Sequence, residues 1–507
     1  MTRGTFSVDL RRVLLLLCGA LGIAAVATLV VMGPTFRWRL EHFWRSSAFR
    51  YHRLDHAHLN AALGDRLLPG EPGDATNPPG EVLIIVLDTV RRDHLGLYTP
   101  GLNTSPGIDS WSEQARVFTS AHSTSSWTLP AHASLFTGLA PSDHGAHGLA
   151  PEDKTWDGFE DAYALPDGTP TLASTLRLSG YTTVGIASNQ AYLTPAYKLN
   201  QGFDSWLCGE LEPEPANHSP SARRVTDLAT SVLERPRSEP LLLFLNYMDA
   251  HTPYRWYGDE PQEIGVFTHS IGEPWLRRCD EILTGERPMT ADEHQRLVQA
   301  YDGEIRYLDS QLGPLLERLP ELGIDHNDFV VVTSDHGEYL GEQGLVEHSK
   351  DLHEPVLAIP LMVRGPGYSS GRDHDPIQLS DLPTLILEGL GMPPLPGSQA
   401  RDDFEVAELY YSRHKDLERE ARRAQMYRIR RTFLHEGRKI FTSDGRCEEA
   451  YDLTIDPGEL QPAGEAAWRI EICGEGRAWQ DGVQTPKLQP PGEVQTSEEQ
   501  LRALGYL

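Results

Sequence analysis

The chain alternates between continuous apolar runs and amphipathic stretches, and this pattern predicts an α/β fold. Runs of apolar and β-branched residues lie at residues 82–87, 182–187, 241–247 and 329–333. Such uninterrupted runs are typical of strands that are buried on both faces of a parallel sheet. Residues 291–318 instead place leucine, isoleucine and tyrosine on one face at helical spacing. Strands that alternate with helices predict a parallel-rich sheet flanked by helices on both sides.

The pattern changes from about residue 400 onward. Short strand-like segments at residues 427–430, 439–442 and 449–453 are separated by turns, which predicts a small α+β subdomain. Residues 498–507 have the character of a short terminal helix. We therefore expect a catalytic domain at residues 81–395 and a C-terminal subdomain and tail at residues 396–507.

The N-terminal part contains an apolar run that begins at Val13 and ends at Met32, long enough to span a bilayer as a helix. Arginines lie on both sides of the run, so they do not set its orientation. We expect residues 1–32 to form a tail and an uncleaved single-pass anchor, with a periplasmic or extracellular catalytic domain. A cleaved secretory signal is the alternative. Residues 33–80 form a juxtamembrane segment and a linker rich in proline and glycine.

Charge and cysteine content narrow the classes of partner. The formal net charge of −28 argues against a nucleic-acid partner and against non-specific adhesion to anionic lipid. The five cysteines form no CxxC or Cys/His pattern of a zinc site. An oxidising compartment would permit the pairs Cys208–Cys279 and Cys447–Cys473, and buried free thiols are an equally good interpretation.

Polar residues with metal-ligand capacity follow three of the predicted strands. Asp88 ends the first, His251 lies shortly after the third, and Asp335 with His336 follows the fourth. In an open parallel sheet, ligands bind at the carboxyl ends of the strands. Each residue alone has a structural interpretation, such as a helix cap or a loop histidine. Together, Asp88, Asp335 and His336 predict a site for one divalent cation such as Ca²⁺, Mn²⁺ or Zn²⁺.

Thr128 is the predicted nucleophile. It begins the segment Thr128-Leu129-Pro130, in which a proline suits the first turn of a helix. A helix N-terminus favours a bound anion, and a metal ion lowers the pKa of a ligating hydroxyl. We therefore expect Thr128 to act both as a metal ligand and as the attacking group.

A glycine-punctuated loop at residues 337–350 is predicted to return to the site. His348 is expected to orient or protonate the leaving group, and Lys350 to pair with a substrate oxygen. A solvated surface lysine is the alternative for Lys350. His251 and His348 together are an alternative site for a second ion.

These motifs resemble those of the sulfatases and the wider alkaline phosphatase superfamily over roughly residues 81–395. The resemblance rests on residues 87–93, 128–138, 249–254 and 334–338, with a weaker match at residues 451–459 and 501–507. It implies the α/β fold of that superfamily, a divalent metal and ester hydrolysis. It also implies that His132, His251 and His348 contact the substrate.

The chain departs from the formylglycine-dependent sulfatase pattern, which is Cys or Ser, any residue, Pro, any residue, Arg. Thr128 and His132 stand at the outer positions, and threonine is not expected to become formylglycine because the aldehyde needs a primary Cβ. Asp88-Thr89 replaces a pair of aspartates. A threonine nucleophile with Asp335-His336 is similar instead to phosphoethanolamine transferases and lipoteichoic acid synthase.

We therefore expect a membrane-anchored, metal-dependent hydrolase or transferase that acts on a sulfate or phosphate (di)ester. Phosphate and phosphonate esters are favoured because of the threonine, and the substrate is anionic and linked to a lipid or glycan. A sulfatase without formylglycine is one alternative, since a single metal with few cations around it suits a monoanionic ester. A catalytically silent binding protein on the same scaffold is the other.

Overall fold

The computed structural model describes residues 80–149, 162–208, 222–252, 254, 273–398, 404–411, 428–483 and 488–491. The predicted anchor at residues 13–32 and the predicted helix at residues 498–507 lie outside these ranges. Among the helices that are described, none combines the length and apolar character needed to cross a membrane.

An eight-stranded sheet forms the centre of the fold, in the order β11-β2-β10-β7-β1-β6-β4-β5. Its strands are β1 (Val82–Leu87), β2 (Arg116–Phe118), β4 (Thr182–Ala187), β5 (Ser205–Leu207), β6 (Leu241–Tyr247), β7 (Phe329–Thr333), β10 (Leu361–Arg364) and β11 (Gly371–Asp373). The four strands predicted from apolar runs have the predicted bounds and are buried throughout, which confirms the assignment.

The sheet is mixed and largely parallel, which agrees with the parallel-rich sheet predicted from the sequence. Strands β7, β1, β6, β4 and β5 run parallel to their neighbours, but β10 is antiparallel to both β7 and β2. The connection from β7 to β10 contains only short elements, among them α11 (Glu354–Leu357), and no long crossover helix. Antiparallel neighbours need no such crossover, which accounts for the reversal.

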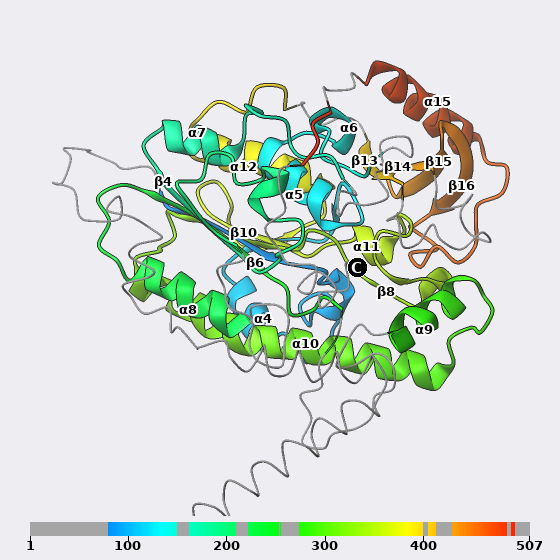
Figure 1. Cartoon of the computed structure of the whole chain (residues 1–507), viewed down its shortest axis with the longest axis horizontal. Coiled ribbons are helices and arrows are strands. Elements are labelled where there is room, and N and C mark those ends of the chain that lie inside the picture. The colour runs from blue at the N-terminus through cyan, green and yellow to red at the C-terminus, as the bar shows by residue number, and fades with distance from the viewer. Residues whose placement is uncertain are drawn as a thin grey trace, which may run out of the picture. The chain divides into compact units, whose positions relative to one another are not determined.

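Helices cover both faces of the sheet (Figure 1), as predicted. One face carries α4 (Pro106–Ser112), α8 (Ala222–Leu233) and α10 (Ala291–Arg318). The other carries α5 (Thr128–Thr137), α7 (Leu172–Leu178) and α12 (Leu382–Gly389). The bounds predicted for α10 are confirmed, and Thr290 begins this helix through a capping box with Glu293. The remaining α-helices described are α6 (Pro141–His144), α9 (Glu273–Leu283) and α15 (Ala467–Gly482).

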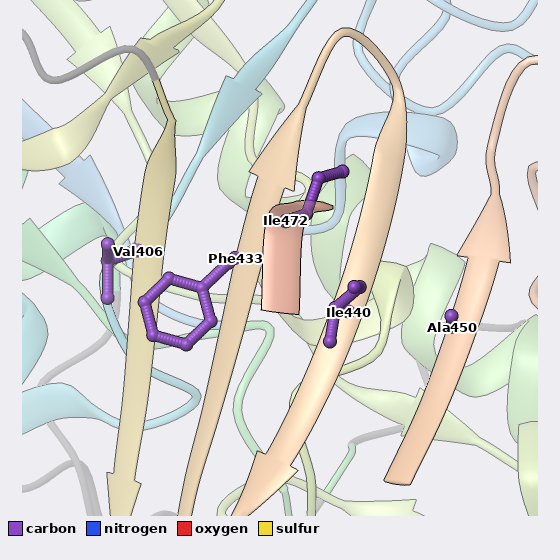
Figure 2. Packing of buried hydrophobic residues seen from close by; sticks show 5 residues of the cluster. All are labelled: Val406, Phe433, Ile440, Ala450 and Ile472. Atoms are coloured by element: carbon purple, nitrogen blue, oxygen red, sulfur yellow. The ribbon is translucent and has the colours of Figure 1, made fainter. Parts of the chain in front are cut away.

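A four-stranded antiparallel sheet follows in the C-terminal part. It consists of β13 (Glu405–Tyr410), β14 (Ile429–His435), β15 (Arg438–Ser443) and β16 (Arg446–Asp452). Helix α15 packs on it around the cluster Val406, Phe433, Ile440, Ala450 and Ile472 (Figure 2). The short strands predicted here are present, while β13 and α15 give no clear signal in the sequence.

A disulfide joins Cys447 of β16 to Cys473 of α15. The other pair that the sequence permits is not formed, since Cys208 and Cys279 are both thiols. Cys208 follows β5 and its Sγ lies 3.4 Å from the carbonyl of Asn189, while Cys279 belongs to α9. The cross-link therefore lies in the C-terminal sheet rather than across the catalytic part.

Candidate active site

The carboxyl ends of two adjacent strands, β1 and β7, bring the predicted metal ligands together. Strand β1 lies between β6 and β7, and Asp88 follows β1 directly. Asp335 and His336 lie just beyond β7. Ligand atoms of Asp88, Asp335 and His336 all lie within 4.8 Å of one another, and the three side chains are fully buried. The sequence prediction of a shared edge is therefore confirmed in geometry.

Each carboxylate uses one oxygen for the protein and directs the other into the cluster. Asp335 Oδ1 accepts the amides of Thr89 at 3.2 Å and His336 at 2.9 Å. Asp88 Oδ2 accepts the side-chain amides of Asn189 at 3.1 Å and Asn246 at 3.2 Å. Among the described residues, Asp88 Oδ1 and Asp335 Oδ2 have no hydrogen-bond partner although both are buried. Buried oxygens without a donor are costly, and a cation would compensate them.

The electrostatics of the two aspartates also favour a cation. Burial and the charge of Asp335 raise the pKa of Asp88 to about 7. Burial likewise raises the pKa of Asp335 to about 7, against main-chain hydrogen bonds that lower it. Two buried carboxylates destabilise each other when both are charged, and a divalent ion between them reverses that balance. The donor set of two carboxylate oxygens and one imidazole nitrogen thus fits a divalent cation.

His336 presents its Nε2 atom to the cluster. Its Nδ1 lies 2.9 Å from the carbonyl of Gly337, and since a carbonyl only accepts, Nδ1 carries the proton. Nε2 lies 3.4 Å from Asp335 Oδ2 and 3.5 Å from Thr128 Oγ1. A second partner that fixes the tautomer is typical of a metal-ligating histidine.

Thr128 is the first residue of α5 and is 1% exposed. Asn189 Nδ2 donates to its Oγ1 at 3.3 Å, and His336 Nε2 lies 3.5 Å from the same oxygen. The hydroxyl therefore lies beside the candidate metal cluster and at a helix N-terminus, as predicted. This position combines the helix dipole with the cluster, the arrangement that binds and polarises an anionic ester.

His132 lies one turn further along α5, where its ring is enclosed. Its Nδ1 donates to the carbonyl of Thr128 at 2.9 Å and lies 3.4 Å from Asp335 Oδ2. The ring packs edge-on against Phe136 and Phe244. Burial lowers the pKa of His132 to about 3, so the ring is neutral. Its contacts support the residues around Thr128, and a contact with substrate stays a prediction.

The histidines after β6 and β9 (Val346–Glu347) meet beside this cluster. The ring of His348 lies 4.9 Å from that of His251 and 4.7 Å from that of His336, measured between centroids. His251 Nδ1 lies 2.5 Å from the carbonyl of Thr252, which leaves Nε2 as its acceptor nitrogen. The loop at residues 337–350 thus returns to the site as predicted, and the amide of Ser349 donates to the carbonyl of Ser126 at 2.9 Å.

Lys350 is buried rather than solvated. Its Nζ lies 3.5 Å from Glu347 Oε2, and its side chain is 0% exposed. Burial removes the alternative of a surface lysine. It does not identify a substrate partner, so the pairing of Lys350 with a substrate oxygen stays a prediction.

Two asparagines complete the site, and sequence reasoning did not identify them. Asn246 is part of β6, and Asn189 follows β4 by two residues. Asn246 Oδ1 accepts the amides of Ser188 at 3.2 Å and Asn189 at 2.9 Å, which orients the loop that carries Asn189. The available signal was the same one that identified Asp88, namely a polar residue at the carboxyl end of a buried strand.

Comparison with known proteins places this geometry in context. The family model described as Sulfatase matches residues 81–392. Iduronate 2-sulfatase of Mus musculus is 25% identical over 350 residues, which cover 58% of this chain and 61% of that enzyme. The human iduronate 2-sulfatase is 25% identical over 412 residues, which cover 69% and 70%. The chain therefore spans less than two thirds of the mouse enzyme.

Solved structures share the fold at low identity. A 2-O GAG sulfatase superposes with a TM-score of 0.61 at 16% identity, covering 83% of this chain and 98% of that one. The phosphonate monoester hydrolase of Agrobacterium radiobacter superposes with a TM-score of 0.59 at 18% identity, covering 79% and 95%. One architecture thus serves both sulfate and phosphonate esters, and fold alone does not choose between them.

Proposed function

This chain belongs to the sulfatase family of ester hydrolases, within the alkaline phosphatase superfamily, and we propose that it uses Thr128 as the nucleophile in a divalent-metal-dependent reaction. The substrate is an anionic sulfate or phosphate (di)ester, and phosphate or phosphonate esters are preferred. The observation that carries the proposal is the position of Thr128 Oγ1, 3.5 Å from His336 Nε2 and 3.3 Å from Asn189 Nδ2.

Asp88, Asp335 and His336 would hold the ion together with the hydroxyl of Thr128. When bound, the ion supplies Lewis-acid polarisation and favours the alkoxide form of the nucleophile. Thr128 Oγ1 gives up its proton and attacks phosphorus or sulfur, the ester bond to the leaving oxygen breaks, and that oxygen takes up the proton. Asn189 Nδ2 orients the attacking oxygen in this step.

The second step releases the transferred group from Thr128. Water or an acceptor alcohol attacks, the bond to Thr128 Oγ breaks, and Thr128 recovers its proton. His251 and His348 are placed to stabilise oxygens, to move this proton or to bind a second ion. His132 holds the carbonyl of Thr128 and thereby the first turn of α5.

The decisive experiment compares Thr128→Ala and Thr128→Ser on aryl sulfate, aryl phosphate, aryl phosphodiester and aryl phosphonate substrates. Thr128→Ala is expected to lose about 10³-fold or more in kcat, while serine, which keeps the hydroxyl, retains a measurable share. Thr137→Ser, in the last turn of the same helix, is the matched control. Full turnover by Thr128→Ala would refute the mechanism, and a trapped phosphothreonine would establish phosphoryl transfer.

Sulfate ester hydrolysis without formylglycine is the second candidate. The sulfatases among the relatives and solved structures favour it. The small number of positive charges in the predicted site also favours it, because a sulfate ester is monoanionic. Lys350 is the one fixed positive charge proposed for the substrate. The same substrate panel decides between the two. A protein that turns over none of the four and holds no divalent ion would instead be a silent binding protein.

Membrane attachment through residues 13–32, with the catalytic part outside the cytoplasm, is a separate proposal that rests on the apolar run alone. A glycan- or lipid-linked substrate is part of it, and D-glucosamine-2-N,6-O-disulfate is named as the substrate of one structural neighbour. Extraction of the full chain from membranes by alkaline carbonate would contradict the anchor.

A further inference from the structure

Glu338, two residues after His336, is a fully buried carboxylate. It lies between Gly337 and the first residue of β8 (Tyr339–Leu340) and is 0% exposed. Its Oε1 lies 2.9 Å from His348 Nδ1, and its Oε2 accepts the hydroxyl of Tyr254 at 3.1 Å. Burying a carboxylate costs several kcal/mol unless it is paired and hydrogen-bonded, and both oxygens have such a partner.

The pairing of β8 with β9 sets the contact between Glu338 and His348. In this hairpin Tyr339 stands opposite Glu347 and Leu340 stands opposite Val346. Glu338 and His348 are the next pair outward, so the antiparallel register brings them together. Glu347 and Ser349 both have positive φ, at 62° and 58°, on either side of His348. Such a backbone is costly for residues other than glycine and persists where surrounding contacts hold it in place.

Tyr254 connects this carboxylate to the segment after β1. Its ring lies edge-on against that of Tyr301 on α10, 5.7 Å between centroids. The Tyr301 hydroxyl donates to the carbonyl of Thr89 at 2.7 Å and accepts the amide of Arg91 at 2.8 Å. Burial and the charge of Glu338 hold the pKa of Tyr254 well above its ordinary value, so its hydroxyl donates.

The orientation of His348 follows from these contacts. Glu338 accepts from Nδ1, which therefore carries a proton and is occupied by this contact. Since the two ring nitrogens point in different directions, chemistry on the substrate must use Nε2. A carboxylate on the far nitrogen also raises the basicity of the ring and fixes its tautomer.

From this arrangement we propose that Glu338 and Tyr254 are positioning residues for the reaction. They act through His348, fixing its ring and its tautomer so that Nε2 is presented beside His251 and His336. The inference rests on the proposed function, because it takes the group around Thr128 to be catalytic. It extends that function by two residues for which no role was assigned from the sequence.

The test is a double-mutant cycle between Glu338→Gln and His348→Ala, measured as kcat and KM on the best aryl ester. Glu338→Gln keeps the size of the side chain and is expected to lower kcat by about 10- to 100-fold with little change in KM. In the His348→Ala background the same change is expected to have almost no further effect, because groups that act as a unit are not additive. Tyr254→Phe, which removes one hydroxyl, is expected to lower kcat about fivefold.

Asp302→Asn is the matched control for loss of a buried carboxylate. Asp302 pairs with His94 Nδ1 at 2.7 Å, and the His94 ring lies edge-on to that of Tyr301, 5.0 Å between centroids. The control is expected to lower thermal stability as Glu338→Gln does, with kcat changed less than about twofold.

Two results would overturn the proposal. One is an equal loss of kcat from Glu338→Gln in both backgrounds, which would make its effect independent of His348. The other is unchanged kcat in both Glu338→Gln and Tyr254→Phe. If Thr128→Ala were fully active, the proposed function itself would fail, whereas an inactive Thr128→Ala with an additive Glu338→Gln would reject this inference alone.

Discussion

His122 provides a pH-dependent contribution to stability that can be worked out from its contacts. It lies in β3 (Ala121–His122) and is 5% exposed. Its Nε2 lies 3.2 Å from Glu354 Oε2, and its Nδ1 lies 3.2 Å from Glu405 Oε1. Burial opposes the charged form, but Glu405 and Glu354 outweigh it and raise the pKa of His122 to about 9. Lys439 and Arg92 are the further charges near this pair.

The sign and size of the effect follow from the ordinary histidine pKa of 6.5, which applies to the unfolded chain. The folded protein keeps this proton between pH 6.5 and 9 while the unfolded chain loses it. The stabilisation is therefore complete below pH 6.5 and is lost as the pH rises through 9. At about 1.4 kcal/mol per pKa unit, a rise of about 2.5 units corresponds to ~3 kcal/mol. The loss is expected at no more than about 1.4 kcal/mol per pH unit.

The assay is the free energy of unfolding in urea from pH 6 to pH 10, at a fixed concentration of divalent metal, for the natural chain and for His122→Gln. Glutamine keeps a donor but not the charge, so the difference between the proteins is expected to be ~3 kcal/mol near pH 6, to fall as the pH rises from 6.5 towards 9, and to be nearly gone above pH 9. His326→Gln, which changes an exposed histidine, is the control. Parallel curves for the natural chain and His122→Gln across pH 6.5–9 would refute the reasoning.

Two further predictions concern the candidate metal site and the C-terminal sheet. Removal of divalent ions by a chelator is expected to abolish turnover and to lower the unfolding temperature, because one buried oxygen each of Asp88 and Asp335 then lacks a partner. An unchanged unfolding temperature would argue against a resident ion. Phe433→Ala is expected to cost about 3–5 kcal/mol of stability in denaturant unfolding, because Phe433 is 0% exposed in the cluster drawn in Figure 2. Leu178→Ala, at an 87% exposed position, is the control and is expected to change stability by no more than about 0.5 kcal/mol.

The strands and the metal ligands were predictable because one physical rule connects them. A strand buried on both faces must be apolar throughout, so β1 and β7 are visible as runs, and the polar residue that ends each run marks the edge of the sheet. Asp88 and Asp335 follow directly from that rule. A separate rule places Thr128 at a helix start, because the proline two residues later is compatible with the first turn of a helix.

What the sequence did not reveal depends on register and on contacts between distant segments. Glu338 meets His348 only because β8 and β9 pair with one particular register, and two-residue strands leave no periodic pattern. Tyr254 reaches Glu338 across 84 residues of chain. Strand β10 resembles any short apolar run, and its antiparallel direction follows from the connection before it rather than from its residues.

The C-terminal sheet contacts the segment that precedes Thr128 and the segment that follows His348. In β13, the amide of Glu408 donates to the carbonyl of Thr124 at 2.9 Å, four residues before Thr128. In β14, Arg430 Nε donates to Asp351 Oδ1 at 2.9 Å, three residues after His348. Arg430 is 1% exposed, so this ion pair is shielded from solvent and fixes geometry more firmly than a surface pair would. Positioning of Thr128 and His348 therefore depends on residues beyond the matched family region, which ends at residue 392.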